Sequence, residues 1–232
     1  MHVPDGFINA PVSVATGVVA AIGVGVALRG ARRELDDATA PLAGVSAAFI
    51  FAAQMLNFPV AAGTSGHLLG GALAAILVGP YTGALVVAVV LFVQGLLFAD
   101  GGLTALGTNI TIMSLVTVLV GYGVFRAVLA VLPEKRVSVS VATFLGAVVS
   151  VPAAAVVFTG IYAIGGTTDI PLGSMLTAMV GVHLLIGLGE AVITTATVSS
   201  ALAVRPDLVY GARGLRKPLQ IIKVSDSQGA AA

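Results

Sequence analysis

Seven apolar stretches alternate with short polar or turn-forming segments along this chain of 232 residues. They cover residues 8–28, 41–58, 66–79, 82–98, 105–128, 138–164 and 173–203. A helix needs about 20 mainly apolar residues to cross a bilayer, and all the stretches except the third approach or exceed that length. The pattern therefore predicts an all-α integral membrane protein with seven transmembrane helices.

The third stretch, residues 66–79, is short for a span, because it rises only about 21 Å at 1.5 Å per residue. A re-entrant segment is the alternative. Charge favours a crossing: with seven spans, all 11 Lys and Arg residues fall on one side, as the positive-inside rule requires. Without that span, Arg126 to Arg136 would lie opposite Arg29 to Arg33. We therefore expect the N-terminus outside and the C-terminus in the cytoplasm.

Composition points to the same class of protein. Hydrophobic residues make up 58% of the chain and charged residues only 9%, with a mean hydropathy of +1.08, whereas soluble domains carry about 25% charged residues. No charged residue occurs between Asp37 and Asp100. We expect residues 1–205 to form one transmembrane domain in the lipid bilayer. Residues 206–232 are expected to form a cytoplasmic polar tail that is partly disordered.

Several chemistries are excluded by what the sequence lacks. The chain has no cysteine, which excludes disulfides, thiolate metal sites and cysteine nucleophiles. It has no basic stripe with interleaved aromatics, so no nucleic-acid partner is expected. The G-x-x-x-x-G-K-[ST] phosphate loop is missing, so the chain itself cannot hydrolyse ATP. Protease and hydrolase motifs are missing too. We therefore expect that the protein is not an enzyme and has no catalytic residues and no catalytic cofactor.

The first two residues can form a chelating group. The N-terminus lacks the features of a signal peptide, and Met1 is expected to be retained because methionine aminopeptidase prefers a second residue smaller than His2. The Met1 amine, the His2 amide nitrogen and the His2 imidazole can then close two fused chelate rings in one plane. A deprotonated amide favours square-planar Ni²⁺, Cu²⁺ or low-spin Co²⁺. Alone, a histidine near a terminus is usually incidental.

His67 is the candidate fourth ligand. It opens the third stretch after an irregular segment, and the predicted topology places it on the same face of the membrane as His2. Two of the three histidines on one face of an uncharged bundle indicate a metal site of Met1, His2 and His67. The alternative is a helix-start histidine that is hydrogen-bonded locally. Asn57 is the best candidate for orienting a ligand histidine.

His183 and Glu190 form a second feature, seven residues apart on one face of the last predicted helix. Ionisable residues inside a membrane are functional candidates by default. The pair could be a second ion station, a proton relay or a structural hydrogen-bonding pair, and we favour the structural or subunit-docking role. The rival function is a self-sufficient secondary metal transporter or channel that uses His183 and Glu190.

Several blocks of the sequence match a known family. The opening from Met1 to Phe7, with QMLNFP at 54–59 and GTSGHLLGG at 63–71, resembles the CbiM/NikM-type substrate-binding S component of cobalt/nickel energy-coupling factor (ECF) transporters. Later blocks match in the same order at residues 100–102, 183–190 and 205–209. The resemblance covers about residues 1–215.

The resemblance implies a six-helix core with an extra N-terminal helix that delivers the chain end into the site. It implies Co²⁺ or Ni²⁺ as the transported ion, held by Met1, His2 and His67, without separating the two metals. The expected partners are a transmembrane coupling (T) protein, a pair of ABC-type ATPases and a small accessory membrane subunit. The expected location is the prokaryotic cell membrane, and the expected role is capture of the ion for ATP-driven uptake.

Overall fold

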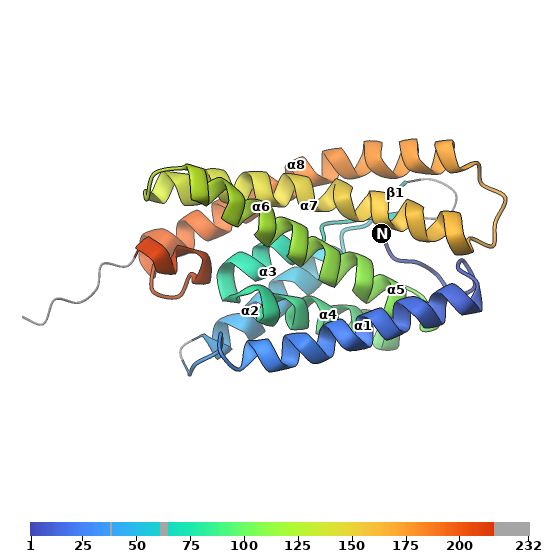
Figure 1. The fold of residues 1–232 in the computed structure, drawn as a ribbon, viewed down its shortest axis with the longest axis horizontal. Coiled ribbons are helices and arrows are strands. Elements are labelled where there is room, and N and C mark those ends of the chain that lie inside the picture. The colour runs from blue at the N-terminus through green and yellow to red at the C-terminus, as the bar shows by residue number, and fades with distance from the viewer. Residues whose placement is uncertain (38, 61–64, 216–232) are drawn as a thin grey trace, which may run out of the picture.

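The computed structural model describes residues 1–37, 39–60 and 65–215, which form an elongated bundle of helices (Figure 1). In chain order the helices are α1 (Ala10–Ala31), α2 (Ala40–Gln54), α3 (Gly71–Val78), α4 (Pro80–Leu97), α5 (Leu106–Asn109), the π-helix η1 (Ile110–Val116), α6 (Thr117–Val131), α7 (Arg136–Gly165), α8 (Leu172–Val204) and the 3-10 helix η2 (Tyr210–Leu215). Strands β1 (Phe58–Pro59) and β2 (Ser65–Gly66) form a short antiparallel pair. The predicted helical class is confirmed as a nearly all-helical fold.

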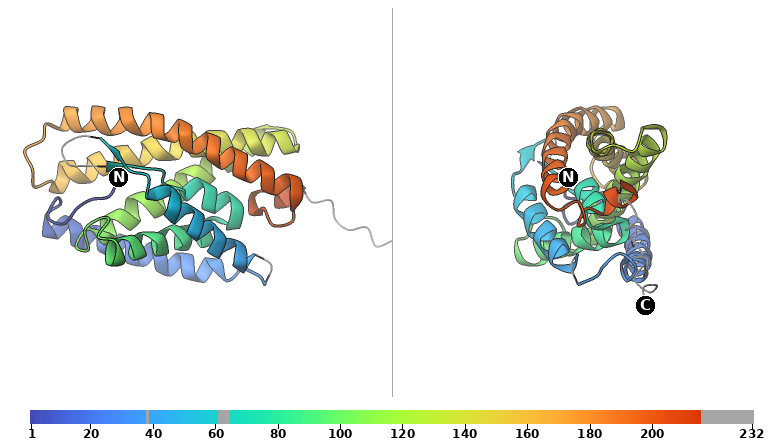
Figure 2. Two further views of the ribbon diagram at one scale, coloured as in Figure 1. Left: turned by 180° about the vertical axis from the view of Figure 1, so that it is seen from behind. Right: turned by 90° about the vertical axis from the view of Figure 1, so that its left-hand side faces the viewer.

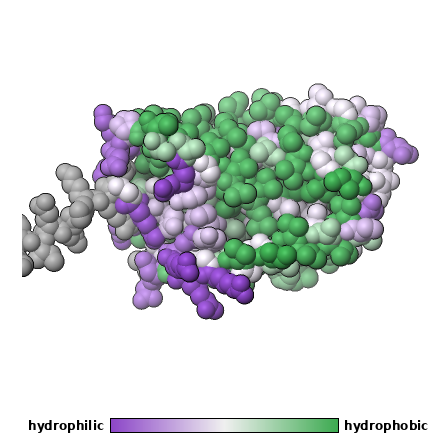
Figure 3. All heavy atoms as spheres, in the orientation of Figure 1, coloured by the Kyte–Doolittle hydropathy of each residue, from purple (hydrophilic) through white to green (hydrophobic). Residues whose placement is uncertain are grey.

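Five helices of the described chain are long and apolar enough to cross a membrane. They are α1, α4, α7, α8 and the continuous helix from Leu106 to Val131 that α5, η1 and α6 build together. Helix α2 is apolar but shorter, at 15 residues. Polar residues gather at one end of the molecule and apolar side chains cover most of its length (Figure 3). The protein is therefore a multi-pass membrane protein.

The predicted third span is a much shorter helix than expected. Helix α3 has eight residues, all of them buried, and rises only about 12 Å. Glycine in a positive-φ conformation bounds it on both sides, with φ of 78° at Gly70 and 102° at Gly79. Most other residues avoid this conformation, so the helix stops at both positions. Helix α3 cannot cross a bilayer of ordinary thickness alone.

Helices α2 and α3 together lead the chain away from the end of α1 and then back to the same end of the bundle. The carboxylate of Glu34, just after α1, accepts hydrogen bonds from Tyr81 N (3.2 Å) and Thr82 N (2.7 Å) at the start of α4. The end of α3 therefore lies at the same end of the bundle as the end of α1. The charge argument needs such a return, because it places Arg29 and Arg126 on one side of the membrane. The count of seven crossings and their orientation stay predictions.

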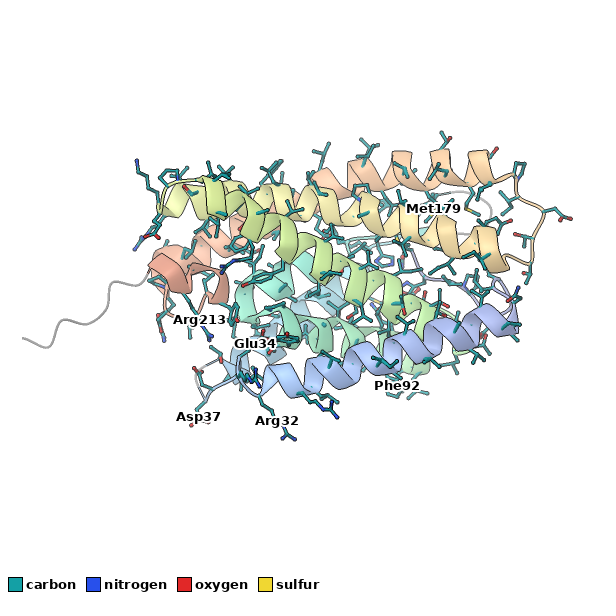
Figure 4. All side chains as sticks on the ribbon, in the orientation of Figure 1. Arg32, Glu34, Asp37, Phe92, Met179 and Arg213 are labelled. Atoms are coloured by element: carbon teal, nitrogen blue, oxygen red, sulfur yellow. The ribbon has the colours of Figure 1, made fainter. Side chains whose placement is uncertain are left out.

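The packed chain extends past the last long helix. Val209 and Ala212 are buried, and the Arg213 guanidinium donates a 3.2 Å hydrogen bond to the backbone oxygen of Glu34. Figure 4 places Glu34 and Arg213 near one another at the polar end of the bundle. The rest of the expected polar tail, residues 216–232, lies outside the described residues.

Candidate metal centre

The first residues of the chain enter the interior of the bundle. Met1 and Val3 are fully buried and His2 is 6% exposed, and the N-terminus lies among the helices in each view (Figures 1 and 2). A charged, hydrated chain end would ordinarily stay at the surface. Its position inside the bundle therefore indicates that the rest of the fold holds it there.

Two groups of contacts hold the segment that leads inward. Asn9 caps α1 by accepting a 3.0 Å hydrogen bond from Val12 N, which fixes where the helix begins. Before the cap, the Thr167 hydroxyl donates to Gly6 O at 2.6 Å, and Phe7 packs against the ring of Tyr162 with centroids 5.4 Å apart. The loop that joins α7 to α8 thus anchors the segment at the end of the bundle opposite Arg213.

Val3 is held on both sides of its backbone. Its N–H donates to Asn109 Oδ1 at 2.7 Å, and its carbonyl accepts from Asn109 Nδ2 at 3.2 Å and from Gly102 N at 2.8 Å. Gly102 lies so close to the segment that a Cβ there would be 2.3 Å from Asp5 N. The His2 N–H, in contrast, donates to no acceptor within the described part of the chain.

The structure brings His2 and His67 together. Their rings are stacked, with centroids 4.5 Å apart and planes inclined by 25°, although 64 residues separate them in the sequence. His67 is fully buried. Its Nδ1 lies 2.8 Å from Leu68 O, so Nδ1 carries the hydrogen and Nε2 presents a lone pair. Among the described residues, that buried Nε2 finds no hydrogen-bond partner.

Asp100 adds a negative charge beside the two rings. One of its oxygens lies 3.1 Å from His2 Nδ1. This contact lowers the pKa of the Asp100 carboxyl, against the opposite effect of its partial burial. Asn57 lies close enough to Asp100 to lower the pKa of that carboxyl as well.

Burial also lowers the pKa of the amine at the chain end. Loss of water lowers the pKa of the Met1 amine from 8.0 to about 4, with the charge of Asp100 acting in the opposite direction. Desolvation likewise lowers the pKa of His67 well below its ordinary value, and the nearby amine adds to that effect. At neutral pH both nitrogens therefore carry lone pairs that can bind a metal ion.

Side chains alone do not make a metal site here. Within the described ranges, no group of three or more His, Cys, Asp or Glu residues lies close enough to hold an ion. Backbone groups are the further donors that the chain end offers to a site with His2 and His67. The Met1 amine and the unpaired His2 amide are two such donors, and the stacked rings lie beside them.

Glu190 does not join this group of donors. His183 Nδ1 lies 2.7 Å from Met179 O, and its buried Nε2 has no hydrogen-bond partner among the described residues. Both oxygens of Glu190 are used, accepting from Leu69 N at 2.6 Å and from Gly70 N at 3.0 Å. The contacts of Glu190 fit a structural role, while the role of His183 stays a prediction. Sequence reasoning could not name the backbone groups that Glu190 binds.

Comparisons with known proteins show the family of this chain. Residues 2–208 match the family model of the CbiM cobalt uptake substrate-specific transmembrane region. A Haloquadratum walsbyi protein named for metal transport is 40% identical over 90% of this chain and 94% of its own length. A fused NikMN protein of Archaeoglobus fulgidus, named for nickel transport, is 43% identical over 90% of this chain and 68% of its own length.

The fold is shared with a solved structure as well. The crystal structure of a truncated transition metal transporter aligns with a TM-score of 0.77 and 30% identity, over 88% of this chain and 99% of that one. The family model, which matches residues 2–208, covers His2, His67 and the whole of α8. With its apolar helices, the chain is a multi-pass protein of a prokaryotic membrane, and it belongs to the CbiM family of cobalt uptake substrate-specific transmembrane proteins.

Proposed function

We propose that this chain captures Co²⁺ or Ni²⁺ from outside the cell, as the substrate-specific membrane subunit of an ATP-driven ECF-type importer. The ion is bound by four nitrogens: the Met1 amine, the deprotonated His2 amide, His2 Nδ1 and His67 Nε2. To bind the ion, His2 Nδ1 gives up its contact with Asp100. The capture subunit binds its cargo and performs no catalysis. Imported cobalt would serve cobalamin synthesis, and imported nickel would serve nickel enzymes.

The observation that carries this proposal is the stacked pair of His2 and His67 beside a buried chain end. The buried amine, the two rings and the unused amide supply nitrogen donors only. Such a set, with a deprotonated amide among its members, suits square-planar Ni²⁺ or low-spin Co²⁺ better than metals that prefer oxygen ligands. Asp100 offsets part of the positive charge of the bound ion.

Transport requires partners that supply energy. The chain has no phosphate-binding loop, so ATP hydrolysis belongs to a separate pair of ABC-type ATPases, joined through a transmembrane coupling protein. A small accessory membrane subunit completes the assembly. The fused NikMN relatives of Archaeoglobus fulgidus and Rhodobacter capsulatus support the idea that this chain acts together with other components.

The proposed orientation places the chain end on the outer side of the membrane. The side chains of Arg29, Arg126 and Arg213 would face the cytoplasm, following the positive-inside rule. Metal would enter at the opposite end, near Asp100. The loop from Pro59 to Gly66 would close over the bound ion. Residues 61–64 of this loop lie outside the described residues.

The direct test is a calorimetric titration of the untagged protein with Co²⁺, Ni²⁺, Cu²⁺ and Zn²⁺, repeated with His2→Ala. We expect tight binding of Ni²⁺ and Co²⁺ that His2→Ala abolishes. Equal binding by the variant would contradict the site. The rival secondary transporter predicts uptake into proteoliposomes without any ATPase. That rival is weakened because both Glu190 oxygens are already engaged by the backbone.

A further inference from the structure

Glu190 is connected to His67 through a single peptide group. The peptide between Leu68 and Leu69 offers its carbonyl to His67 Nδ1 at 2.8 Å, and its N–H donates to Glu190 Oε2 at 2.6 Å. The second carboxylate oxygen accepts from Gly70 N at 3.0 Å. Glu190 is only 2% exposed. A buried carboxylate on α8 therefore holds the group that orients the His67 ring.

The same peptide segment is held from a second helix. Gln54, the last residue of α2, donates through Nε2 to Leu69 O at 2.8 Å. Closer to the start of α8, Ile186 packs against Gly66, where a Cβ would lie 2.6 Å from its Cδ1. Residues 66–70 thus lie between α2 and α8, and three of their backbone groups bind side chains of those helices.

We propose that Glu190 is a positioning residue for metal capture, acting through the Leu68–Leu69 peptide on His67. This inference rests on the metal site proposed above. A carboxylate that accepts from the peptide N–H polarises the carbonyl on the other side of that peptide, because hydrogen bonds in a chain strengthen one another. The carbonyl then holds the Nδ1 hydrogen of His67 and directs its Nε2 lone pair to the metal. Partners of this kind commonly set ligand orientation and basicity.

The chain contains a matched control for this role. Glu34 is also buried, at 3% exposure, and it also accepts from two successive backbone N–H groups, those of Tyr81 and Thr82. It lies at the polar end of the bundle (Figure 4), away from Met179, which precedes His183 by one helical turn in α8. Glu34→Gln removes the same kind of contact as Glu190→Gln, but at a place far from His2 and His67.

The experiment compares Ni²⁺ binding by the full-length protein, Glu190→Gln and Glu34→Gln in detergent. Glutamine keeps one acceptor oxygen, but its NH₂ group is a donor and cannot accept a hydrogen bond from the second backbone N–H. We expect Glu190→Gln to weaken Ni²⁺ binding about tenfold and to shift the visible absorption band of the bound Ni²⁺. Glu34→Gln should do neither, while both variants lose thermal stability to a similar degree. Equal Ni²⁺ affinities of the two variants would overturn the proposal.

A double-mutant cycle separates positioning from general destabilisation. If Glu190 acts through His67, Glu190→Gln should have no further effect on Ni²⁺ affinity in a His67→Ala background. An undiminished tenfold effect there would overturn the assignment. Hydrogen exchange of the metal-free protein tests the contact itself: amides 69 and 70 should exchange faster in Glu190→Gln than in Glu34→Gln, and unchanged exchange would refute it. If His2→Ala leaves binding intact while this difference in exchange persists, the proposed metal site fails and the contact stands.

Discussion

The two halves of the candidate site reach the same point in different ways. The N-terminal half is a chain end, held through its backbone by Asn109 and Gly102, and it offers three nitrogens from two residues. The His67 half is an internal loop, held by Gln54 and Glu190 from two helices, and it offers one nitrogen. Covalent connection sets the geometry of the first half, while packing sets that of the second.

This difference indicates how affinity is divided. Donors in fused chelate rings bind a metal together, because the first bond already places the others at the right distance. A single imidazole on a separate loop adds one bond, whose strength depends on how well that loop is held. We therefore expect changes in the first two residues to cost more affinity than changes around His67.

The largest effect should come from one extra residue before Met1. An added residue converts the Met1 amine into an amide and inserts atoms into a fully buried site. Ni²⁺ binding should weaken by at least about a thousandfold, about 4 kcal/mol, measured by competition with a chromophoric chelator. An equal extension after Ala232 should have no effect, and cleavage that regenerates Met1 should restore binding. Unchanged affinity of the N-terminally extended protein would eliminate the amine as a ligand.

The second effect tests the His67 half. His67→Ala removes one of four nitrogens but leaves the chelate rings intact, so we expect about a hundredfold loss of Ni²⁺ affinity. His183→Ala is the matched control, because His183 is the other fully buried histidine of the described chain. It should change affinity by less than about threefold. A larger effect from His183→Ala than from His67→Ala would favour the secondary transporter.

The sequence predicted the long helices well and the short one badly. The stretches 105–128 and 173–203 correspond to helices that end within a few residues of the predicted limits, because continuous apolar runs leave little choice inside a bilayer. The stretch 66–79 was recognised as short for a span, but not as a helix of only eight residues. Its helix is limited by positive φ at Gly70 and Gly79, and a glycine in an apolar run does not reveal its backbone conformation.

The site divides in the same way between predicted and unpredicted features. Topology alone placed His2 and His67 on one face of the membrane. The roles of Asn109 and Asp100 depend on contacts with residues about a hundred positions away, which no local pattern encodes. Glu190 was noticed as a buried carboxylate, but its partners are backbone N–H groups, which every residue except proline possesses. Supporting contacts of that kind become visible only in three dimensions.

A smaller effect on Ni²⁺ affinity should follow from removing the hydrogen bonds between Asn109 and the Val3 backbone. Asn109→Ala removes a donor and an acceptor from the buried Val3 backbone, and unsatisfied groups of this kind cost about 1–3 kcal/mol. Because a bound metal also holds the segment, we expect about a tenfold loss of Ni²⁺ affinity in the same competition assay. Thr108→Val is the control, since Thr108 contacts Thr16 at 2.7 Å and not the N-terminal segment. Equal losses in the two variants would assign the effect to the helix and not to Val3.

The smallest effect concerns protons, and it tests the burial of the chain end. With the pKa of the Met1 amine lowered to about 4, the amine is neutral at pH 7 and releases no proton when the metal binds. Of the two backbone nitrogens, only the His2 amide then releases a proton, and one released proton makes affinity rise about threefold between pH 7.0 and 7.5 and fall equally in reverse. An amine with its ordinary pKa of 8.0 would release most of a second proton and make the rise nearly tenfold. Calorimetry in two buffers of different ionisation enthalpy counts these protons directly. A count near two would mean that the amine is charged and hydrated before the metal binds, and the chain end would then not be buried in the metal-free protein.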